Sequence, residues 1–154
     1  GNGDWHWFRY PYLREGETPA KLARMREWLA ATGQRNLPVT IDDQDWSFEE
    51  PWVKARQAGD AARLARLGED YQHALRLETL MYTAAGDELF GRPTPQILLL
   101  HANEVGTAQW DALFTWMKGR GFRFASVDDQ GLAFQRVEKH LATQPAKGNV
   151  ASIR

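Results

Sequence analysis

Short apolar runs alternate with longer helical segments along most of this chain, and this alternation constrains the fold more than any other feature. Runs typical of strands occur near residues 5–9, 37–42, 97–101 and 122–127. An order of strand, helix, strand, helix, strand, helix, strand is typical of parallel α/β architecture. A complete eight-stranded barrel usually needs about 200 residues or more, so a chain of 154 residues predicts about half a barrel or a small open sheet.

Three helices are expected between these strands. Thr18, which a proline follows, is a favourable N-cap for the first. Asp60 is expected to cap a long helix that ends near Gly91, and Thr107 is expected to cap the last helix. The segment 43–52 is predicted to be a polar and aromatic loop. The helices would cover the outside of the sheet.

Composition excludes several classes of protein. Hydrophobic residues make up 43% of the chain, which is enough to bury a core. The net charge of −1 favours neither nucleic acid nor an anionic membrane as a partner. The absence of cysteine excludes disulfides and thiolate metal sites, and no apolar run approaches the roughly 20 residues of a membrane span.

The two ends of the chain carry less information. We expect residues 1–143 to belong to one domain and residues 144–154, which are small and polar, to form a tail. The segment that begins at Gly1 reads as a loop running into a strand, so we expect the native chain to begin further upstream. The lack of a signal peptide is then uninformative, and a secreted or periplasmic location is favoured.

Polar and aromatic side chains follow the first three strands: Arg9, Tyr12, Asp42, Asp43, Asp45, Trp46 and His101. Because the carboxyl ends of parallel strands meet at one edge of the sheet, these side chains are expected to converge there. Each has a simpler explanation when taken alone. The histidine could be structural, the aspartates a solvated or calcium-binding loop, the tryptophan a packing residue, and the arginine a partner for a surface carboxylate.

The combination resembles the polysaccharide deacetylases, the NodB-like carbohydrate esterases. "FRYPYLREG" resembles their R-x-P-[YW] motif, "DDQDW" their D-x-x-D-W motif and "LLLHAN" their L-x-H motif, in the family's order. The segment leading to the last motif also resembles bacterial members. The resemblance covers about residues 5–128 and implies a parallel (β/α) barrel of the NodB-like type, of which this chain would be roughly the C-terminal half.

The resemblance also implies an activity, the metal-dependent hydrolysis of N-acetyl or sometimes O-acetyl groups on N-acetylglucosamine-type poly- or oligosaccharides. His101, which matches the histidine of L-x-H, would protonate the leaving amine. Asp45 would hold the imidazole and favour its charged form. Arg9 would pair with the catalytic base and keep it ionised.

Three further matches would bind the substrate. The backbone N–H of Tyr12 would help to stabilise the tetrahedral oxyanion. Trp46 and Leu99 would line the pocket for the acetyl methyl group. An acetylated carbohydrate is therefore the expected partner, without a choice between chitin, peptidoglycan and another acylated sugar.

Two family motifs, which would supply the base and the metal ligands, are missing. T-F-D-D and H-[ST]-x-x-H would precede Arg9, and none of the four histidines is spaced for the second. A divalent metal, for which zinc is the usual guess, is therefore expected to bind residues absent from this chain. A half-barrel would expose a strand edge, so we expect it to pack against the missing N-terminal segment or another copy of the chain.

Two other interpretations stay open. The chain could be a non-catalytic carbohydrate-binding module on a degenerate deacetylase fold, since its seven tryptophans could stack on sugar rings. It could also be an unrelated α/β domain in which the motifs are coincidental. The native sequence upstream of these motifs discriminates, because a T-F-D-D and an H-[ST]-x-x-H motif there would favour the enzyme.

Overall fold

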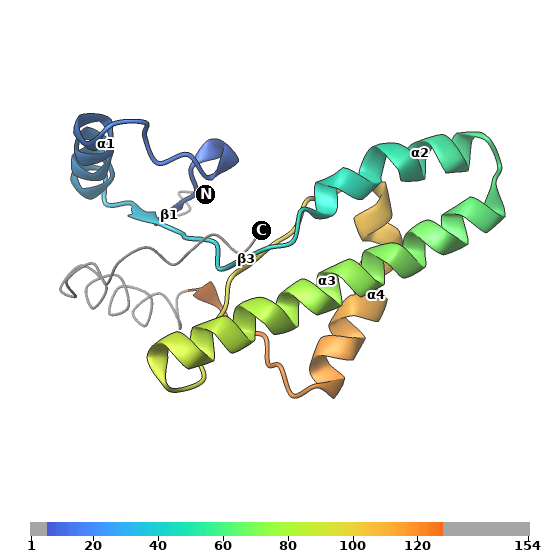
Figure 1. Ribbon diagram of the computed structural model, residues 1–154. Helices are drawn as coiled ribbons and strands as arrows, with labels where there is room; N and C mark the ends of the chain where they lie inside the picture. Colours follow the sequence, from blue (N-terminus) through green and yellow to red (C-terminus); the bar gives the residue numbers. More distant parts are fainter. Residues whose placement is uncertain (1–5, 128–154) are drawn as a thin grey trace.

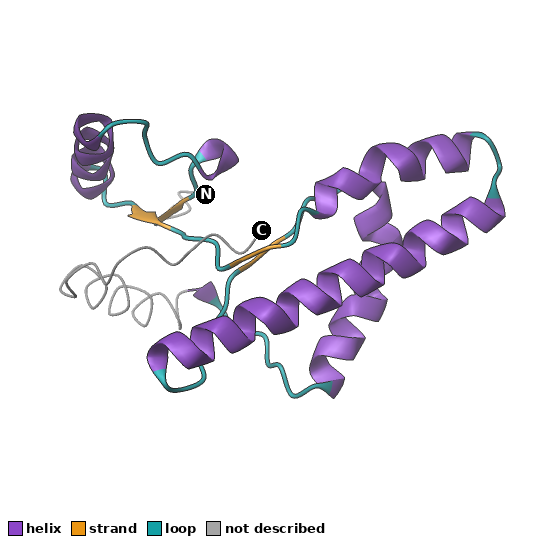
Figure 2. Cartoon of the chain, viewed as in Figure 1, coloured by secondary structure: helices purple, strands orange, loops and turns teal. Residues whose placement is uncertain are grey.

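A computed structural model describes residues 6–127 of the chain (Figure 1, Figure 2). In chain order its elements are β1 (Trp7–Phe8), the short 3-10 helix η1 (Pro11–Leu13), α1 (Pro19–Ala31), β2 (Arg35–Asn36), β3 (Ile41–Asp42), the 3-10 helix η2 (Asp45–Phe48), α2 (Glu49–Gln57), α3 (Ala61–Phe90), β4 (Leu98–Leu99) and α4 (Glu104–Gly119). The predicted tail, residues 144–154, lies outside the described residues.

Helices dominate the described part of the chain. The helices α2, α3 and α4 contact one another, and α3 also contacts β3 and η2. Figure 1 shows α1 and β1 at the opposite end of the molecule from the turn that joins α2 to α3, with β3 between them. That turn contains Gly59, whose φ of 66° lies in the left-handed region that glycine adopts easily. Within residues 6–127, no helix combines the length and the apolar character needed to cross a membrane.

The strands form two separate sheets of two strands each. β1 pairs with β2 and β3 pairs with β4, both in parallel, which confirms the expected strand direction. The prediction of one sheet containing all four strands is wrong. Pro38 lies between β2 and β3 and has no N–H to donate to a ladder, and the Ile97 N–H donates to the Thr40 hydroxyl at 2.6 Å instead of to a backbone carbonyl. The half-barrel stays a prediction.

The predicted fourth strand is also wrong. Residues 122–126 form no strand in the part of the chain that the structure describes. The N–H of Phe122 donates to the carbonyl of Met117 at 3.1 Å, so the segment begins by closing the end of α4. Its apolar residues alone therefore did not determine a strand.

Helix ends that depend on local side chains agree with the sequence in most cases. Thr18 and Asp60 cap α1 and α3 as expected, and Gly91 ends α3 with a φ of 64°. The predicted cap at Thr107 is wrong, because Asn103 caps α4 through its side-chain oxygen. The predicted loop at 43–52 is also wrong in part, since η2 and the start of α2 occupy most of it.

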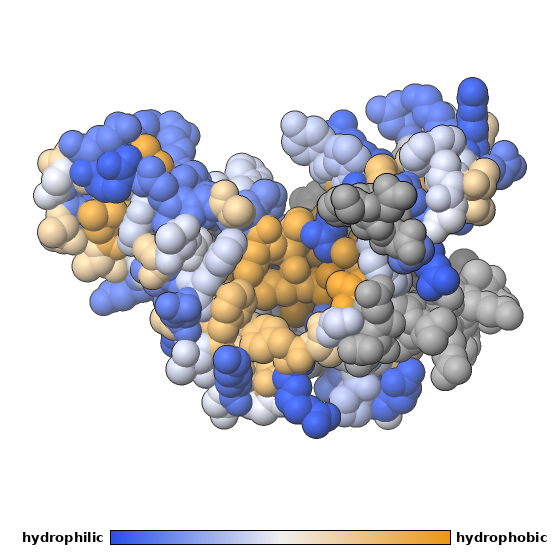
Figure 3. Space-filling view, turned by 180° about the vertical axis from the view of Figure 1, so that it is seen from behind, coloured by the Kyte–Doolittle hydropathy of each residue, from blue (hydrophilic) through white to orange (hydrophobic). Residues whose placement is uncertain are grey.

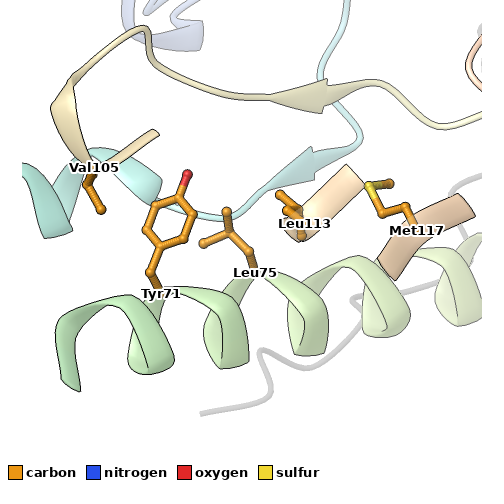
Figure 4. Packing of buried hydrophobic residues seen from close by; sticks show 5 residues of the cluster. All are labelled: Tyr71, Leu75, Val105, Leu113 and Met117. Carbon is orange, nitrogen blue, oxygen red and sulfur yellow. The ribbon is translucent and has the colours of Figure 1, made fainter. Parts of the chain in front are cut away.

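The buried core lies between α3 and α4 (Figure 4). Tyr71 and Leu75 are four residues apart on α3, and Leu113 and Met117 are four apart on α4, so each pair shares one helix face. Val105, in the first turn of α4, is fully buried in the same cluster. Each such side chain contributes roughly 1.5–3 kcal/mol through burial. The start of α4 is therefore anchored to α3.

Hydrophobic side chains also remain on the surface. Figure 3 shows them gathered in a hollowed region near the middle of the back face. On α3, Met81 and Leu89 are 60% and 66% exposed. Surface of this kind is typical of regions that meet further polypeptide. The expectation of a missing segment or a second copy stays a prediction.

Candidate acid–base site at the ends of β3 and β4

The parallel pairing of β3 with β4 determines where the candidate site forms. Ile41 lies opposite Leu98, and Asp42 lies opposite Leu99, so both strands end at the same edge. Asp45 follows β3 in the first turn of η2, and His101 follows β4 before α4 begins. Two residues 56 positions apart in the sequence therefore meet at this edge.

Asp45 holds His101 by two hydrogen bonds. The Nδ1 atom of His101 lies 2.6 Å from Oδ1 of Asp45, and the backbone N–H of His101 donates to Oδ2 at 2.8 Å. Because a carboxylate only accepts, Nδ1 carries the hydrogen and Nε2 lies on the opposite side of the ring. The aspartate side chain is buried, whereas the histidine side chain is 46% exposed. The prediction that these two residues lie within hydrogen-bond distance is confirmed.

A tight turn places Asp45 beneath the histidine. Gln44 has a φ of 51°, an uncommon left-handed conformation for a residue other than glycine. On its other side, the Asp45 N–H donates to Oδ1 of Asp43 at 3.3 Å. Aspartate side chains stabilise turns in this way, two residues before the donor. The "DDQD" segment therefore folds as a turn with two of its carboxylates pointing inward.

Asp43 is unusual for a carboxylate because it is buried and one of its oxygens has no hydrogen-bond partner. It is only 2% exposed, and its Oδ2 is buried without a hydrogen-bond partner. The pKa of Asp43 is raised to about 7, chiefly by burial and then by the nearby carboxylates of Asp45 and Glu78, while the hydrogen bond from the Asp45 N–H opposes this rise. Burial and Asp42 also raise the pKa of Glu78. Asp45 is therefore hydrogen-bonded to an acidic group whose pKa lies near neutral pH.

The position of Arg9 relative to the dyad is not defined by a direct polar contact among the described residues. It is half-buried, and its Nε is buried without a hydrogen-bond partner. Burial lowers the pKa of its guanidinium. Within residues 6–127, no hydrogen bond or ion pair joins Arg9 to the dyad. Its predicted role beside a catalytic base stays a prediction.

The predicted substrate-binding residues differ in exposure. Trp46 follows Asp45 in η2 and is 56% exposed. Tyr12 is 91% exposed and has a φ of 53° in η1. Leu99 is half-buried in β4, opposite Asp42. Trp46 is thus next to the dyad in the chain, and among the described residues no hydrogen bond joins Tyr12 to the dyad.

Metal ligands are not assembled in the described part of the chain. Residues 6–127 contain no group of three or more histidine, cysteine, aspartate or glutamate side chains arranged to hold a metal ion. The acidic turn beneath the dyad does not make such a set. These residues alone thus do not fit the divalent metal that the motifs imply.

No protein-family model, curated protein or solved structure matches the chain. The deacetylase interpretation therefore depends on the three motifs and on the contact between the two residues that the second and third motifs supply.

The sequence interpretation missed a further residue at the site. Glu49, placed in a loop by the sequence, begins α2 and accepts the backbone N–H groups of Glu104 and Val105, both at 3.1 Å. A usable signal was present, because two acidic residues followed by Pro51 are typical of the first turn of a helix.

Proposed function

We propose that this chain supplies the acid side of the active site in a hydrolase that removes N-acetyl, or O-acetyl, groups from N-acetylglucosamine-type poly- or oligosaccharides. The observation that carries the proposal is the Asp45–His101 contact at 2.6 Å, made by the two residues that match the family motifs. In this proposal the chain is the C-terminal half of a NodB-like barrel. The missing half would supply the base.

The dyad is suited to protonating a leaving amine. In amide hydrolysis a water oxygen bonds to the acetyl carbon and the C–N bond breaks, and the amine leaves readily only when its nitrogen receives a proton. His101 would donate that proton from Nε2, on the exposed side of its ring. Asp45 would keep Nδ1–H in place and stabilise the positive charge of the imidazolium before transfer. Acetate and a free amine are the products.

The other motif residues would complete the pocket. Arg9, with its orphaned buried Nε, would pair with the base of the missing half. Tyr12 would offer its backbone N–H to the oxyanion, and Trp46 and Leu99 would contact the acetyl methyl group. A divalent metal would polarise the acetyl carbonyl when bound. Since the described residues provide no ligand set, no step in this chain is assigned to it.

A second candidate function is carbohydrate binding without catalysis. The exposure of Trp46 and Tyr12, at 56% and 91%, favours it, because exposed aromatic rings can stack on sugar faces. In that case the dyad would be a structural tie between β3 and β4. Turnover therefore decides between the two candidates.

The test measures acetate release from N-acetylglucosamine oligomers by the full-length protein with a divalent metal supplied. His101→Ala should lower kcat by about 10²–10⁴-fold, the range typical of a lost general acid or base. Asp45→Asn should also lower kcat, because the amide no longer enforces the Nδ1–H form. The matched control is His73→Ala, an exposed histidine on α3 that is not at the site, and it should keep the wild-type rate.

Three outcomes would overturn the assignment. If His101→Ala retains the wild-type rate, His101 is not the acid. If it loses the metal, as measured by metal content after dialysis, His101 is a ligand instead. If the wild-type protein binds the oligomers but releases no acetate, the binding-module interpretation replaces the enzyme.

A further inference from the structure

Side chains hold the segment between β4 and α4 near both of its ends. His101 donates its backbone N–H to Asp45 at 2.8 Å. The next contacts are at the helix start, where Glu104 and Val105 donate theirs to the two carboxylate oxygens of Glu49, each at 3.1 Å. The side-chain oxygen of Asn103 accepts the N–H of Gly106 at 2.8 Å. The first three N–H groups of α4, which lack partners within the helix, are all satisfied by side chains.

The carboxylate of Glu49 is well placed for this role. A negative charge at a helix N-terminus is favoured by the helix dipole, and α4 is 16 residues long. Both carboxylate oxygens are used, one on each N–H. Val105 is fully buried in the core between α3 and α4. The loop after His101 is therefore attached at its far end to a fixed part of the protein.

Asp45 and Glu49 belong to one helical run, because η2 ends at Phe48 and α2 begins at the next residue. They are four positions apart, so both side chains can reach the same neighbouring segment. Arg56, on the same helix, pairs with Glu104 at 2.6 Å and thereby ties α2 to α4 a second time. A single rigid element thus carries the partner of the imidazole and the anchor of its loop.

We propose that Glu49 is a positioning residue. It fixes the loop after His101 so that the imidazole stays within hydrogen-bond distance of Asp45. Glu49 touches neither the imidazole nor the substrate side of the ring in this arrangement; it acts through the backbone of Glu104 and Val105. The consequence for catalysis rests on the proposed function, whereas the consequence for the dyad does not. A displacement of about 1 Å can lower a rate by about 100-fold, so a loose loop should matter.

The test uses Glu49→Gln and the matched control Glu50→Gln. In the first variant the amide would keep one acceptor oxygen but would turn an NH₂ group towards a backbone N–H, whereas Glu50 contacts only exposed Lys54 in the described residues. For Glu49→Gln we expect faster hydrogen exchange at the amides of Glu104 and Val105, by about tenfold or more. We also expect the downfield proton resonance of His101 Nδ1–H to broaden or disappear. Glu50→Gln should leave both as in the wild type.

Kinetics give the second readout. In the full-length enzyme, Glu49→Gln should lower kcat by about tenfold or more with little change in KM, since the substrate contacts are intact. Glu49→Asp keeps the charge but is shorter, so it should fold and show an intermediate loss even if Glu49→Gln does not fold. A wild-type Nδ1–H resonance in both variants, together with faster amide exchange, would show that Glu49 only stabilises α4 and would overturn the proposal. Because the resonance needs no turnover, that result is separable from a failure of the deacetylase assignment.

Discussion

Replacing Asp43 with asparagine isolates the effect of one buried carboxyl group on stability. The substitution keeps the shape of the side chain but removes its ability to ionise. Asp43 is 2% exposed, its Oδ2 has no hydrogen-bond partner, and Asp45 and Glu78 lie close enough to repel its charge. Ionised Asp43 should therefore destabilise the folded protein.

The structure gives the sign and the size of this effect. The pKa of Asp43 is raised from an ordinary 3.8 to about 7, chiefly by burial. Between these values the folded state binds a proton that the unfolded state has lost, so the free energy of unfolding falls as the pH rises through this window. The full difference corresponds to about 4 kcal/mol. Water entry and local relaxation reduce such penalties, so we expect about 2 kcal/mol at pH 8.

The assay is urea unfolding at pH 5 and pH 8, followed by tryptophan fluorescence. Asp43→Asn should be more stable than the wild type by about 2 kcal/mol at pH 8 but by less than about 1 kcal/mol at pH 5, where only part of the window between the two pKa values has been crossed. Asp111→Asn, which changes an exposed carboxylate on α4, is the control for net charge and should not show this pH-dependent gain. If Asp43→Asn is destabilised equally at both pH values, the native carboxylate is charged and stabilising, and the reasoning is refuted.

Two further predictions concern packing around α4. Gly106→Ala should lower the free energy of unfolding by about 1–3 kcal/mol in urea titrations, because its Cβ would lie 2.7 Å from the packed ring of Trp110. Gly68→Ala should change the free energy of unfolding by less than about 1 kcal/mol, since its Cβ meets the flexible end of a glutamine side chain and alanine favours the helix. An equal loss of stability in the two glycine variants would contradict this distinction. Tyr71→Phe should cost about 1–2 kcal/mol, because it leaves the indole N–H of Trp110 without its acceptor. The exposed Tyr82→Phe should be nearly neutral in the same titration, and equal losses would show that the buried hydrogen bond contributes nothing.

Local signals in the sequence were sufficient for several elements. Thr18 and Asp60 cap their helices because the capping oxygen and its N–H partner are only three residues apart. The contact between Asp45 and His101 was also predictable, since both follow strands that pair in parallel. In this case the match to the motifs indicated which distant residues meet, and local secondary-structure preference alone could not have indicated it.

Features that depend on distant partners were not predictable in the same way. The apolar run at 122–126 resembles a strand, but a strand needs a neighbour and none is present within residues 6–127. Among the three aspartates at the end of β3 and in the turn after it, the sequence does not show which become buried. Packing of the turn against α3, where Glu78 lies, leaves Asp43 inside. Likewise, the role of Glu49 follows only from where α4 begins.

The turn at Gly59 divides the candidate site between two stretches of chain. A protein cut at this turn would leave Asp45 and Glu49 on one fragment and His101 on the other. Non-covalent contacts would join the fragments, among them the packing of α2 with α3 and α4 and the pairing of β3 with β4. Neither fragment would hold a complete dyad. The fold therefore contains a natural point for a split protein, in which recovery of the Asp45–His101 hydrogen bond reports that the two fragments have reassembled.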